Sequence, residues 1–326
     1  MSGKALMARS LAPADLEAWD GLASRHGTLF NCSDWLALFG DNMQALGIFE
    51  DGGQLVGGLS LYQERRFGLK IFRRAPFTPT CGPFLEVKAQ NPVAILETRR
   101  KALESVIEYL AQQSAAIVML PLDQQIVDAL PFLWRGYKVI PNYTYLIDLS
   151  LSLADIQKNM TSSQRNHIAK ARKDLLTVEP TSDMHIVRDL VLATFDRQKK
   201  SLDRSTLEAI LFRFANSSNS FAFTTYRGRN PIATCFVVHD HRTAYNLLAG
   251  YRAEERHHGA GAMAVFEAIK HSQEIGLKTF DFEGSVIPAI EQYFRGFGGK
   301  LKSYFTVNKA WMPVEIVLKF MRRSLF

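Results

Sequence analysis

Three strand-like segments joined by short turns place the strongest constraint on how this chain folds. They cover residues 221–226, 232–239 and 243–250, with five and three residues between them. Such short connections join antiparallel neighbours, because a parallel crossover needs a dozen or more residues. A glycine-containing loop and a helix-like segment, residues 263–275, come next. The pattern predicts a mixed α/β domain built on an antiparallel meander and argues against parallel strand–helix–strand units.

The loop after the meander carries Arg256, Gly259, Gly261 and Ala262. Glycines let backbone N–H groups approach an anion, and the N-terminus of the next helix adds unpaired N–H groups and partial positive charge. The spacing Gly259-x-Gly261-x-x-Ala264 fits the dinucleotide fingerprint. The spacing Arg256-x-x-Gly259-x-Gly261 resembles the acyl-CoA loop of the acetyltransferase superfamily. Eight residues separate the strand from Gly259, so we favour the acyl-CoA interpretation; a solvated loop at a helix start is the third alternative.

Length and composition allow about two soluble domains in these 326 residues. The three cysteines are scattered and form no C-x-x-C pair, which favours a reducing compartment over a disulfide framework. Residues 1–10 lack an apolar segment, and no apolar run reaches about 18 residues. We therefore expect a cytoplasmic protein that does not span a membrane. The net charge of +7 favours anionic partners, although many soluble proteins carry such a charge without one.

The order of the expected elements is repeated along the chain. Helices, antiparallel strands, a long helix and a strand occur in this order in both halves. The long helix covers residues 93–113 in the first half and 259–275 in the second. We expect two domains, residues 1–148 and 149–326, each with a mostly antiparallel central sheet flanked by helices. The second domain would carry the glycine loop.

A basic segment, residues 160–176, contains four Lys and Arg residues and one acidic residue. As a helix it could bind phosphate groups of a donor or acceptor through Arg165, Lys170 and Lys173. The alternative is an ordinary solvated helix face.

An acidic strand is expected at residues 279–285, where apolar and polar residues alternate. Asp281 and Glu283 would face one side near the carboxyl end of this strand. Two such carboxylates could orient an amine or act as a general base. The alternative is that both serve as caps or ion-pair partners.

Several motifs together resemble the FemAB-like group of the acetyltransferase (GNAT) superfamily. Asp281-Phe282-Glu283-Gly284-Ser285 is similar to its D-F-x-G-S motif, and Phe294-Arg295-x-Phe297-Gly298 to a later motif that usually has Lys in place of Arg295. The segment from Arg165 to Lys173 resembles its R-x-x-I-x-K-A-x-K segment. The resemblance implies two tandem GNAT-like domains and the transfer of an acyl or aminoacyl group to an amine.

Site roles follow from this resemblance. Arg256, Gly259, Gly261 and Ala262 would bind the donor's pyrophosphate, and Asp281 or Glu283 would orient or deprotonate the amine. Tyr293 and Arg295 would shape the pocket.

We expect acyl-CoA as co-substrate and an amine of a bacterial cell-envelope, polysaccharide or lipid precursor as acceptor. Two alternatives stay open. One is an aminoacyl-tRNA-dependent aminoacyltransferase of peptidoglycan precursors, and the other is a non-catalytic module that binds a nucleotide or tRNA.

Two further signals concern metals and membranes. His239-Asp240-His241 lies in a turn without an evident third ligand, so we expect no metal site. Residues 311–326 are amphipathic and could lie on an anionic membrane surface, at the periphery of the inner membrane. The alternative is a terminal helix docked on the core.

Overall fold

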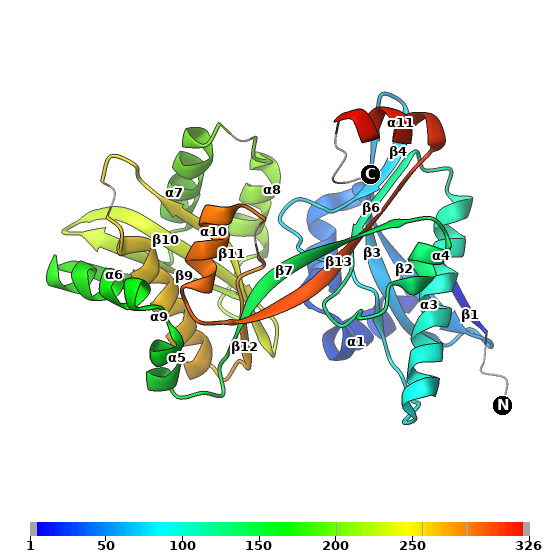
Figure 1. The fold of residues 1–326 in the computed structure, drawn as a ribbon, viewed down its shortest axis with the longest axis horizontal. Helices are drawn as coiled ribbons and strands as arrows, with labels where there is room; N and C mark the ends of the chain where they lie inside the picture. The colour runs from blue at the N-terminus through cyan, green and yellow to red at the C-terminus, as the bar shows by residue number, and fades with distance from the viewer. Residues whose placement is uncertain (1–4, 200, 256, 285, 322–326) are drawn as a thin grey trace. The chain divides into compact units, whose positions relative to one another are not determined.

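The computed structural model describes residues 5–199, 201–255, 257–284 and 286–321 (Figure 1). The chain divides into two compact units. Unit 1 comprises Met1–Asn142 and Ser303–Phe326, and unit 2 comprises Tyr143–Lys302. The observed division therefore differs from the expected one, since residues 303–326 belong with the N-terminal half of the chain.

Unit 1 is built on a sheet with the strand order β1-β2-β3-β4-β6-β13, and β5 pairs with β3. The strands are β1 (Leu6–Ser10), β2 (Met43–Glu50), β3 (Leu55–Arg66), β4 (Leu69–Arg73), β5 (Phe84–Leu85), β6 (Ile117–Pro121) and β13 (Lys300–Ala310). The helices are α1 (Leu16–His26), α2 (Ser33–Leu36), α3 (Pro92–Gln112), α4 (Leu130–Trp134) and α11 (Met312–Met321), with short 3-10 segments at Pro13–Asp15, Leu29–Asn31 and Ala37–Asn42.

Unit 2 has the strand order β7-β12-β11-β10-β9-β8. The strands are β7 (Lys138–Asp148), β8 (Leu176–Pro180), β9 (Ser220–Arg227), β10 (Asn230–His239), β11 (Thr243–Tyr251) and β12 (Thr279–Asp281). The helices are α5 (Leu153–Asn159), α6 (Ser162–Lys173), α7 (Met184–Arg197), α8 (Arg204–Ala209), α9 (Ala260–Glu274) and α10 (Pro288–Arg295), with a π-helical turn at Ile210–Phe214.

The strands of the two units belong to one sheet and repeat one pattern, in agreement with the duplication expected from the sequence. In each unit, four antiparallel strands are followed by a parallel neighbour and then by an antiparallel one. The parallel pair is β4 with β6 in unit 1 and β11 with β12 in unit 2. The mixed α/β fold with mostly antiparallel sheets is thus confirmed.

The last strand of each sheet explains where the units divide. β7 follows β6 along the chain but pairs with β12 of unit 2. β13 follows the strands of unit 2 but pairs with β6 from Thr306 to Ala310. Each unit therefore takes its final strand from the other half of the sequence. A boundary drawn from the linear order of elements could not show this exchange.

The core of unit 2 forms where α6 and α9 cover one face of the sheet, and α7 covers the other at Gly250. Phe280 and Phe282 are fully buried in this core, as the alternation of the strand predicts. In unit 1, the buried face of α3, which includes Leu103 and Val106, packs against the sheet. These two cores hold the sheets on which the candidate site is built.

The C-terminal helix, α11, ends the described part of the chain, and residues 322–326 lie outside it. Val314 and Leu318 are partly buried, whereas Ile316, Val317 and Phe320 are exposed. The structure thus does not show a helix whose apolar side chains are all docked on the core. Among the described residues, no helix combines the length and apolar composition needed to cross a membrane.

Candidate active site

The parallel strands β11 and β12 separate soon after they meet. Within the described residues they pair at three positions, ending at Tyr245 and Asp281, and β11 then continues to Tyr251 paired with β10 but not with β12. At the same level, β11 has one extra residue relative to β10, which places a β-bulge at Asn246–Leu247. A bulge removes backbone groups from the regular ladder. The outer edge of β11 beyond Tyr245 therefore carries backbone groups that β12 does not pair.

The face of β11 beyond the bulge is open beside α9. Ala249 lies opposite Cys235 of β10. Cys235 is fully buried in the core beneath α9, whereas Ala249 is exposed. Because opposite residues of an antiparallel pair point to the same face, helix α9 covers β10 but leaves this part of β11 uncovered.

The expected donor loop meets this open edge, but its residues differ in what they do. An added Cβ at Gly259, the N-cap of α9, would lie 2.0 Å from the carbonyl oxygen of His167. At Gly261 the nearest atom would be the hydroxyl oxygen of Tyr293, at 3.4 Å. Ala262 is fully buried, so its side chain belongs to the core and does not face a ligand. Of the two glycines, Gly261 is the less crowded among the described residues; Arg256 lies outside them.

The two acidic residues are placed differently from the sequence expectation. β12 ends at Asp281, so Asp281 and Glu283 do not share one side of a strand. Asp281 is 3% exposed, and its Oδ1 accepts hydrogen bonds from Thr144 Oγ1 at 2.5 Å and from the Glu283 amide at 2.7 Å. Asp281 therefore fixes the turn that carries the partly exposed Glu283.

Backbone conformation explains the glycine of this motif. Glu283 has φ 57° and Gly284 has φ 73°, so the chain makes two successive left-handed residues. A Cβ at Gly284 would lie 1.9 Å from the carbonyl oxygen of Tyr143. Glycine is thus required both for the conformation and for the close approach of β7.

A small polar cluster lies between the bulge and α10. The Cys235 thiol donates a hydrogen bond to Asn246 Oδ1 at 3.2 Å, and burial raises the pKa of this thiol far above its ordinary value. The cysteine is therefore protonated and unsuited to nucleophilic attack. Burial, with a smaller contribution from nearby Cys235, also raises the pKa of the Tyr293 phenol well above its ordinary value. Tyr293 thus holds its proton close to Gly261.

Arg295, at the end of α10, is hydrogen-bonded to Glu291 of the same helix. Its Nε donates to Glu291 Oε1 at 3.0 Å, and the Tyr145 hydroxyl donates to the same oxygen. Burial and this hydrogen bond raise the pKa of Tyr145. Arg295 therefore braces α10 against β7 through Glu291.

The basic residues of α6 do not form one free phosphate-binding face. Arg165 donates to the carbonyl oxygens of Lys158 and Met160, at the end of α5. Lys170 pairs with Asp174 at 2.9 Å, and Asp174 also accepts from His257 at 2.9 Å. Hydrogen bonds from His257 and Lys170 lower the pKa of Asp174. These contacts tie α6 to the glycine loop, and Lys173 is exposed.

The later glycine motif packs against the start of α6. Gly298 has φ 79°, and a Cβ there would lie 2.3 Å from the carbonyl oxygen of Asn159. The amide of Thr161, the N-cap of α6, donates to the carbonyl oxygen of Gly296 at 2.9 Å. The two motifs that resemble one family in sequence are therefore neighbours in space.

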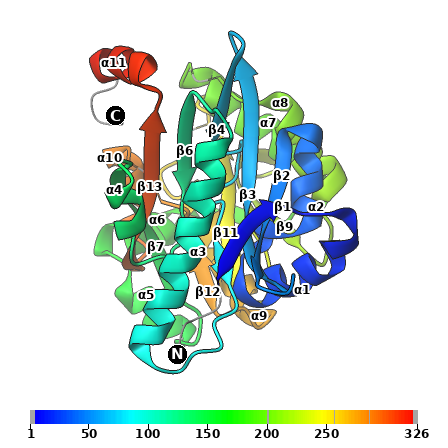
Figure 2. The same cartoon turned by 90° about the vertical axis from the view of Figure 1, so that its right-hand side faces the viewer.

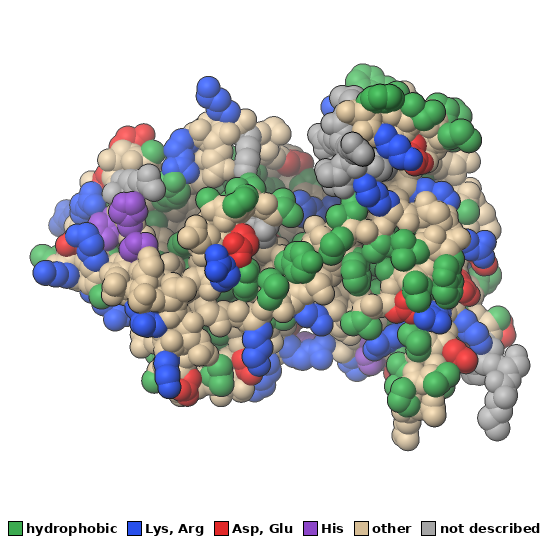
Figure 3. All heavy atoms as spheres, in the orientation of Figure 1, with side chains coloured by type: hydrophobic (Ala, Val, Ile, Leu, Met, Phe, Trp, Pro, Cys, Tyr) green, Lys and Arg blue, Asp and Glu red, His purple; other side chains and the backbone are tan. Residues whose placement is uncertain are grey.

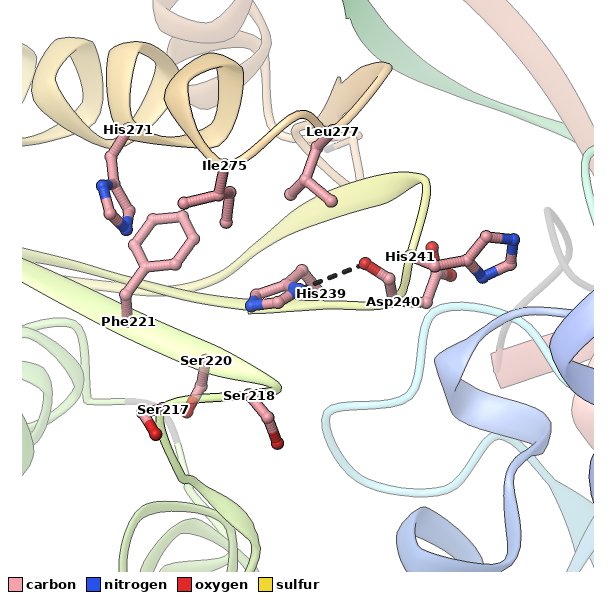
Figure 4. Close-up of a pocket in the computed structure, with 10 residues that line it drawn as sticks. All are labelled: Ser217, Ser218, Ser220, Phe221, His239, Asp240, His241, His271, Ile275 and Leu277. Carbon is pink, nitrogen blue, oxygen red and sulfur yellow. Dashed lines mark hydrogen bonds between the residues drawn. The ribbon is translucent and has the colours of Figure 1, made fainter.

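A separate pocket of about 660 Å³ lies at the other end of α9 (Figure 4). The ring of Phe221 lies between His239 and His271, with centroid distances of 5.8 and 4.7 Å. Asp240 caps the β10–β11 turn by accepting from the amide of Arg242, and His241 lines the pocket from the same turn. No group of three or more His, Cys, Asp or Glu residues in the described parts of the chain could hold a metal ion.

Sequence reasoning did not identify Cys235, Asn246, Tyr145 or Glu291. They come from β10, β11, β7 and α10, so no local spacing marks them. The one available signal was Asn246, a polar residue within an otherwise apolar strand.

Comparisons with known proteins agree with this geometry. Residues 162–295 match a protein family described as an acetyltransferase (GNAT) domain, and no curated protein matches the chain. Among solved structures, FemX is similar with a TM-score of 0.69 at 11% identity, covering 96% of this chain and 99% of its own.

Two other solved structures share the fold. One is the C-terminal domain of a putative lysylphosphatidylglycerol synthetase from Agrobacterium fabrum, with a TM-score of 0.60 at 11% identity and coverage of 94% and 95%. The other is a tandem GNAT protein from the clavulanic acid biosynthesis pathway, with a TM-score of 0.53 at 11% identity and coverage of 94% and 98%.

The matched domain and the fold define an acyltransferase of the GNAT type. More particularly, residues 162–295 carry the GNAT domain, and over nearly its whole length the chain shares the fold of FemX. The resemblance seen in the sequence is thus confirmed.

Proposed function

We propose that unit 2 transfers an acyl group from acyl-CoA to an amine of a small molecule or of a lipid- or glycan-linked precursor. The observation that carries this proposal is the unpaired edge of β11, which begins at the bulge and runs toward Gly261 and Tyr293. Unpaired strand amides suit an extended donor arm, and a helix N-terminus suits its pyrophosphate.

The residues around the start of α9 fit such a donor. Among the described residues, the Tyr293 hydroxyl alone approaches the place of a Gly261 side chain, so backbone N–H groups of the first helical turn can contact phosphate oxygens. Thr225 Oγ1 donates to the carbonyl oxygen of Ala260 at 2.8 Å and fixes this turn to β9. We therefore assign pyrophosphate binding to the backbone around Gly261, and packing to Gly259 and Ala262.

Acyl transfer forms a C–N bond between the amine and the thioester carbonyl carbon and breaks the C–S bond. Backbone N–H groups at Asn246–Leu247 would stabilise the negative charge that develops on the carbonyl oxygen. Glu283 would accept the proton of the attacking amine, and Asp281 would position Glu283 by holding the turn that carries it. Tyr293, whose raised pKa keeps it protonated, would donate its proton to the leaving sulfur.

The class of acceptor is supported by one relative. The putative lysylphosphatidylglycerol synthetase of the same fold is named for a lipid product, which favours a lipid-linked acceptor here. Such an acceptor would place the activity in a bacterial cytoplasm, at the inner face of the membrane.

A thermal-shift titration with acetyl-CoA, longer acyl-CoAs and free CoA tests the proposal. Ligand at about 100 times its Kd stabilises the folded state by about 2.7 kcal/mol. The stabilisation should disappear in Gly261→Glu, because the new carboxylate would repel the pyrophosphate. Gly21→Glu is the matched control, since Gly21 lies in α1 with one flexible side-chain atom at 3.6 Å.

No shift with any CoA, or an equal shift in Gly261→Glu, would contradict an acyl-CoA donor. Salt-dependent binding of aminoacyl-tRNA in its place would favour the tRNA-dependent alternative.

A further inference from the structure

The hairpin between β3 and β4 in unit 1 ends in a strained aromatic turn. Arg66 pairs with Leu69, so Phe67 and Gly68 form a two-residue turn with φ values of 52° and 76°. Asn-Gly or Gly-Gly suits such a turn, because bulky side chains are strained at positive φ. Phe67 is nevertheless there, with 94% of its surface exposed. A strained residue that contributes no burial to the fold points to a contact outside the chain.

Helix α11 begins at the same end of the sheet. The Ala116 amide donates to the carbonyl oxygen of Lys70 at 2.9 Å, and the Trp311 amide donates to that of Ala116 at 2.8 Å. Only β6 thus separates β4 from the start of α11, a lateral distance of about 10 Å at the usual strand spacing. Both views of the fold show the turn and the helix at this end of unit 1 (Figures 1 and 2).

Large apolar side chains cover the outer side of α11 (Figure 3). The exposed ones, with their exposed fractions, are Trp311 (61%), Met312 (73%), Ile316 (54%), Val317 (55%) and Phe320 (87%). A contiguous exposed apolar surface of this kind marks an interaction site. With ten residues, the helix extends about 15 Å, half the hydrocarbon thickness of a bilayer. It can therefore lie on a bilayer but not cross one.

Cations accompany the apolar groups at both places. Arg65 and Arg66 are exposed beside Phe67. Lys319 is on α11, with its side chain 56% exposed and paired with Glu315. Aromatic side chains flanked by Arg and Lys are typical of segments that bind anionic lipid headgroups and insert into the acyl boundary. An acidic protein groove would match the cations but not a helix that is apolar over most of its exposed side.

We propose that the Phe67 turn and residues 311–321, together termed the docking edge, bind the surface of an anionic lipid bilayer. The sequence suggested a membrane contact for the C-terminal segment alone. The structure adds the β3–β4 hairpin, because strand register places its turn beside the start of α11. The inference does not rest on acyl transfer, so its failure and the failure of the proposed function are separate results.

Vesicle sedimentation of the full-length chain tests this inference. Vesicles contain phosphatidylcholine alone or phosphatidylcholine with phosphatidylglycerol, and the bound fraction is measured. We expect strong binding only to the anionic vesicles, weakened about tenfold by Phe67→Asn or by Phe320→Ser because each removes an inserted aromatic ring. The double variant Arg65→Gln/Arg66→Gln should weaken binding to anionic vesicles, and high salt should do the same.

Val93→Ser is the matched control. Val93 is 64% exposed, like the apolar residues of the docking edge. It lies in the first turn of α3, at the end of that helix away from β6 and the docking edge. Its replacement should leave vesicle binding unchanged.

Phe67→Asn also separates binding from folding. Asparagine adopts positive φ readily, so the variant should melt at the wild-type temperature or above it while losing vesicle affinity. Equal sedimentation of all variants, or no binding to either vesicle, would overturn the proposal. Phe67-dependent self-association without lipid would also overturn it, because the partner would then be a second copy of the chain.

Discussion

The two glycines at the start of α9 should respond in opposite ways to the same substitution. A Cβ at Gly259 would lie 2.0 Å from the carbonyl oxygen of His167 and 2.8 Å from the Cβ of Ala171. Neither atom is the end of a flexible side chain, so α6 and α9 would have to move apart. Overpacking of this kind costs about 1–3 kcal/mol. Gly259→Ala should therefore lower the free energy of unfolding by about this amount.

Gly261→Ala should instead be neutral or stabilising. Among the described residues, the new Cβ would meet the Tyr293 hydroxyl alone, at 3.4 Å, and alanine lowers the entropy of the unfolded chain. The expected gain is about 0.5–1 kcal/mol. The two variants should thus differ by about 1.5–4 kcal/mol.

Thermal melting followed by circular dichroism measures this difference. A change of 1 kcal/mol shifts the melting temperature by about 2–4 °C in domains near this size, so the two variants should be separated by several degrees. A Gly259→Ala variant as stable as the wild type would refute the packing argument. A Gly261→Ala variant that melts below the wild type would refute the assignment of open space beside Gly261.

Three further outcomes are expected. Tyr293→Phe should lower kcat by about 10²–10⁴-fold with little change in donor affinity. Because the pKa of Tyr293 is raised, Tyr293 should stay protonated, and its ionisation should not lower the wild-type rate below about pH 10. Glu283→Gln should abolish most turnover, whereas Asp281→Asn should also lower the melting temperature; folded variants of both that keep full activity would contradict the assigned roles. The pKa of Asp174 is lowered, so its stabilising contribution is present above the unfolded pKa near 3.8 and is lost as pH falls through the lower folded value. Melting temperatures from pH 6 to 3 should thus fall less steeply in Asp174→Asn, and an unchanged slope would argue against this linkage.

The sequence allowed most elements to be predicted, because their signals are local. Turns of a few residues identified the antiparallel meander, and period-2 alternation placed Phe280 and Phe282 in the core. The division into units was not predictable in the same way. β7 and β13 each pair with strands from the other half of the chain, and strand pairing leaves no trace in local composition.

The candidate site shows the same limit. Gly259 and Gly261 look equivalent in the sequence, yet one is glycine because α6 approaches it and the other faces open space. Asp281 and Glu283 look like a pair on one strand, yet the strand ends between them and Asp281 holds the turn.

The sequence by itself determined the strands, helices, glycine turns and family motifs, since each depends on backbone preferences and periodicity within a few residues. Only the tertiary structure decided which glycine is packed against α6, that Cys235 and Asn246 lie near Tyr293, and that the Phe67 turn lies beside α11. Those relations depend on strand register and helix packing between segments far apart in the chain, and the free energy that fixes them arises only when the complete core is buried.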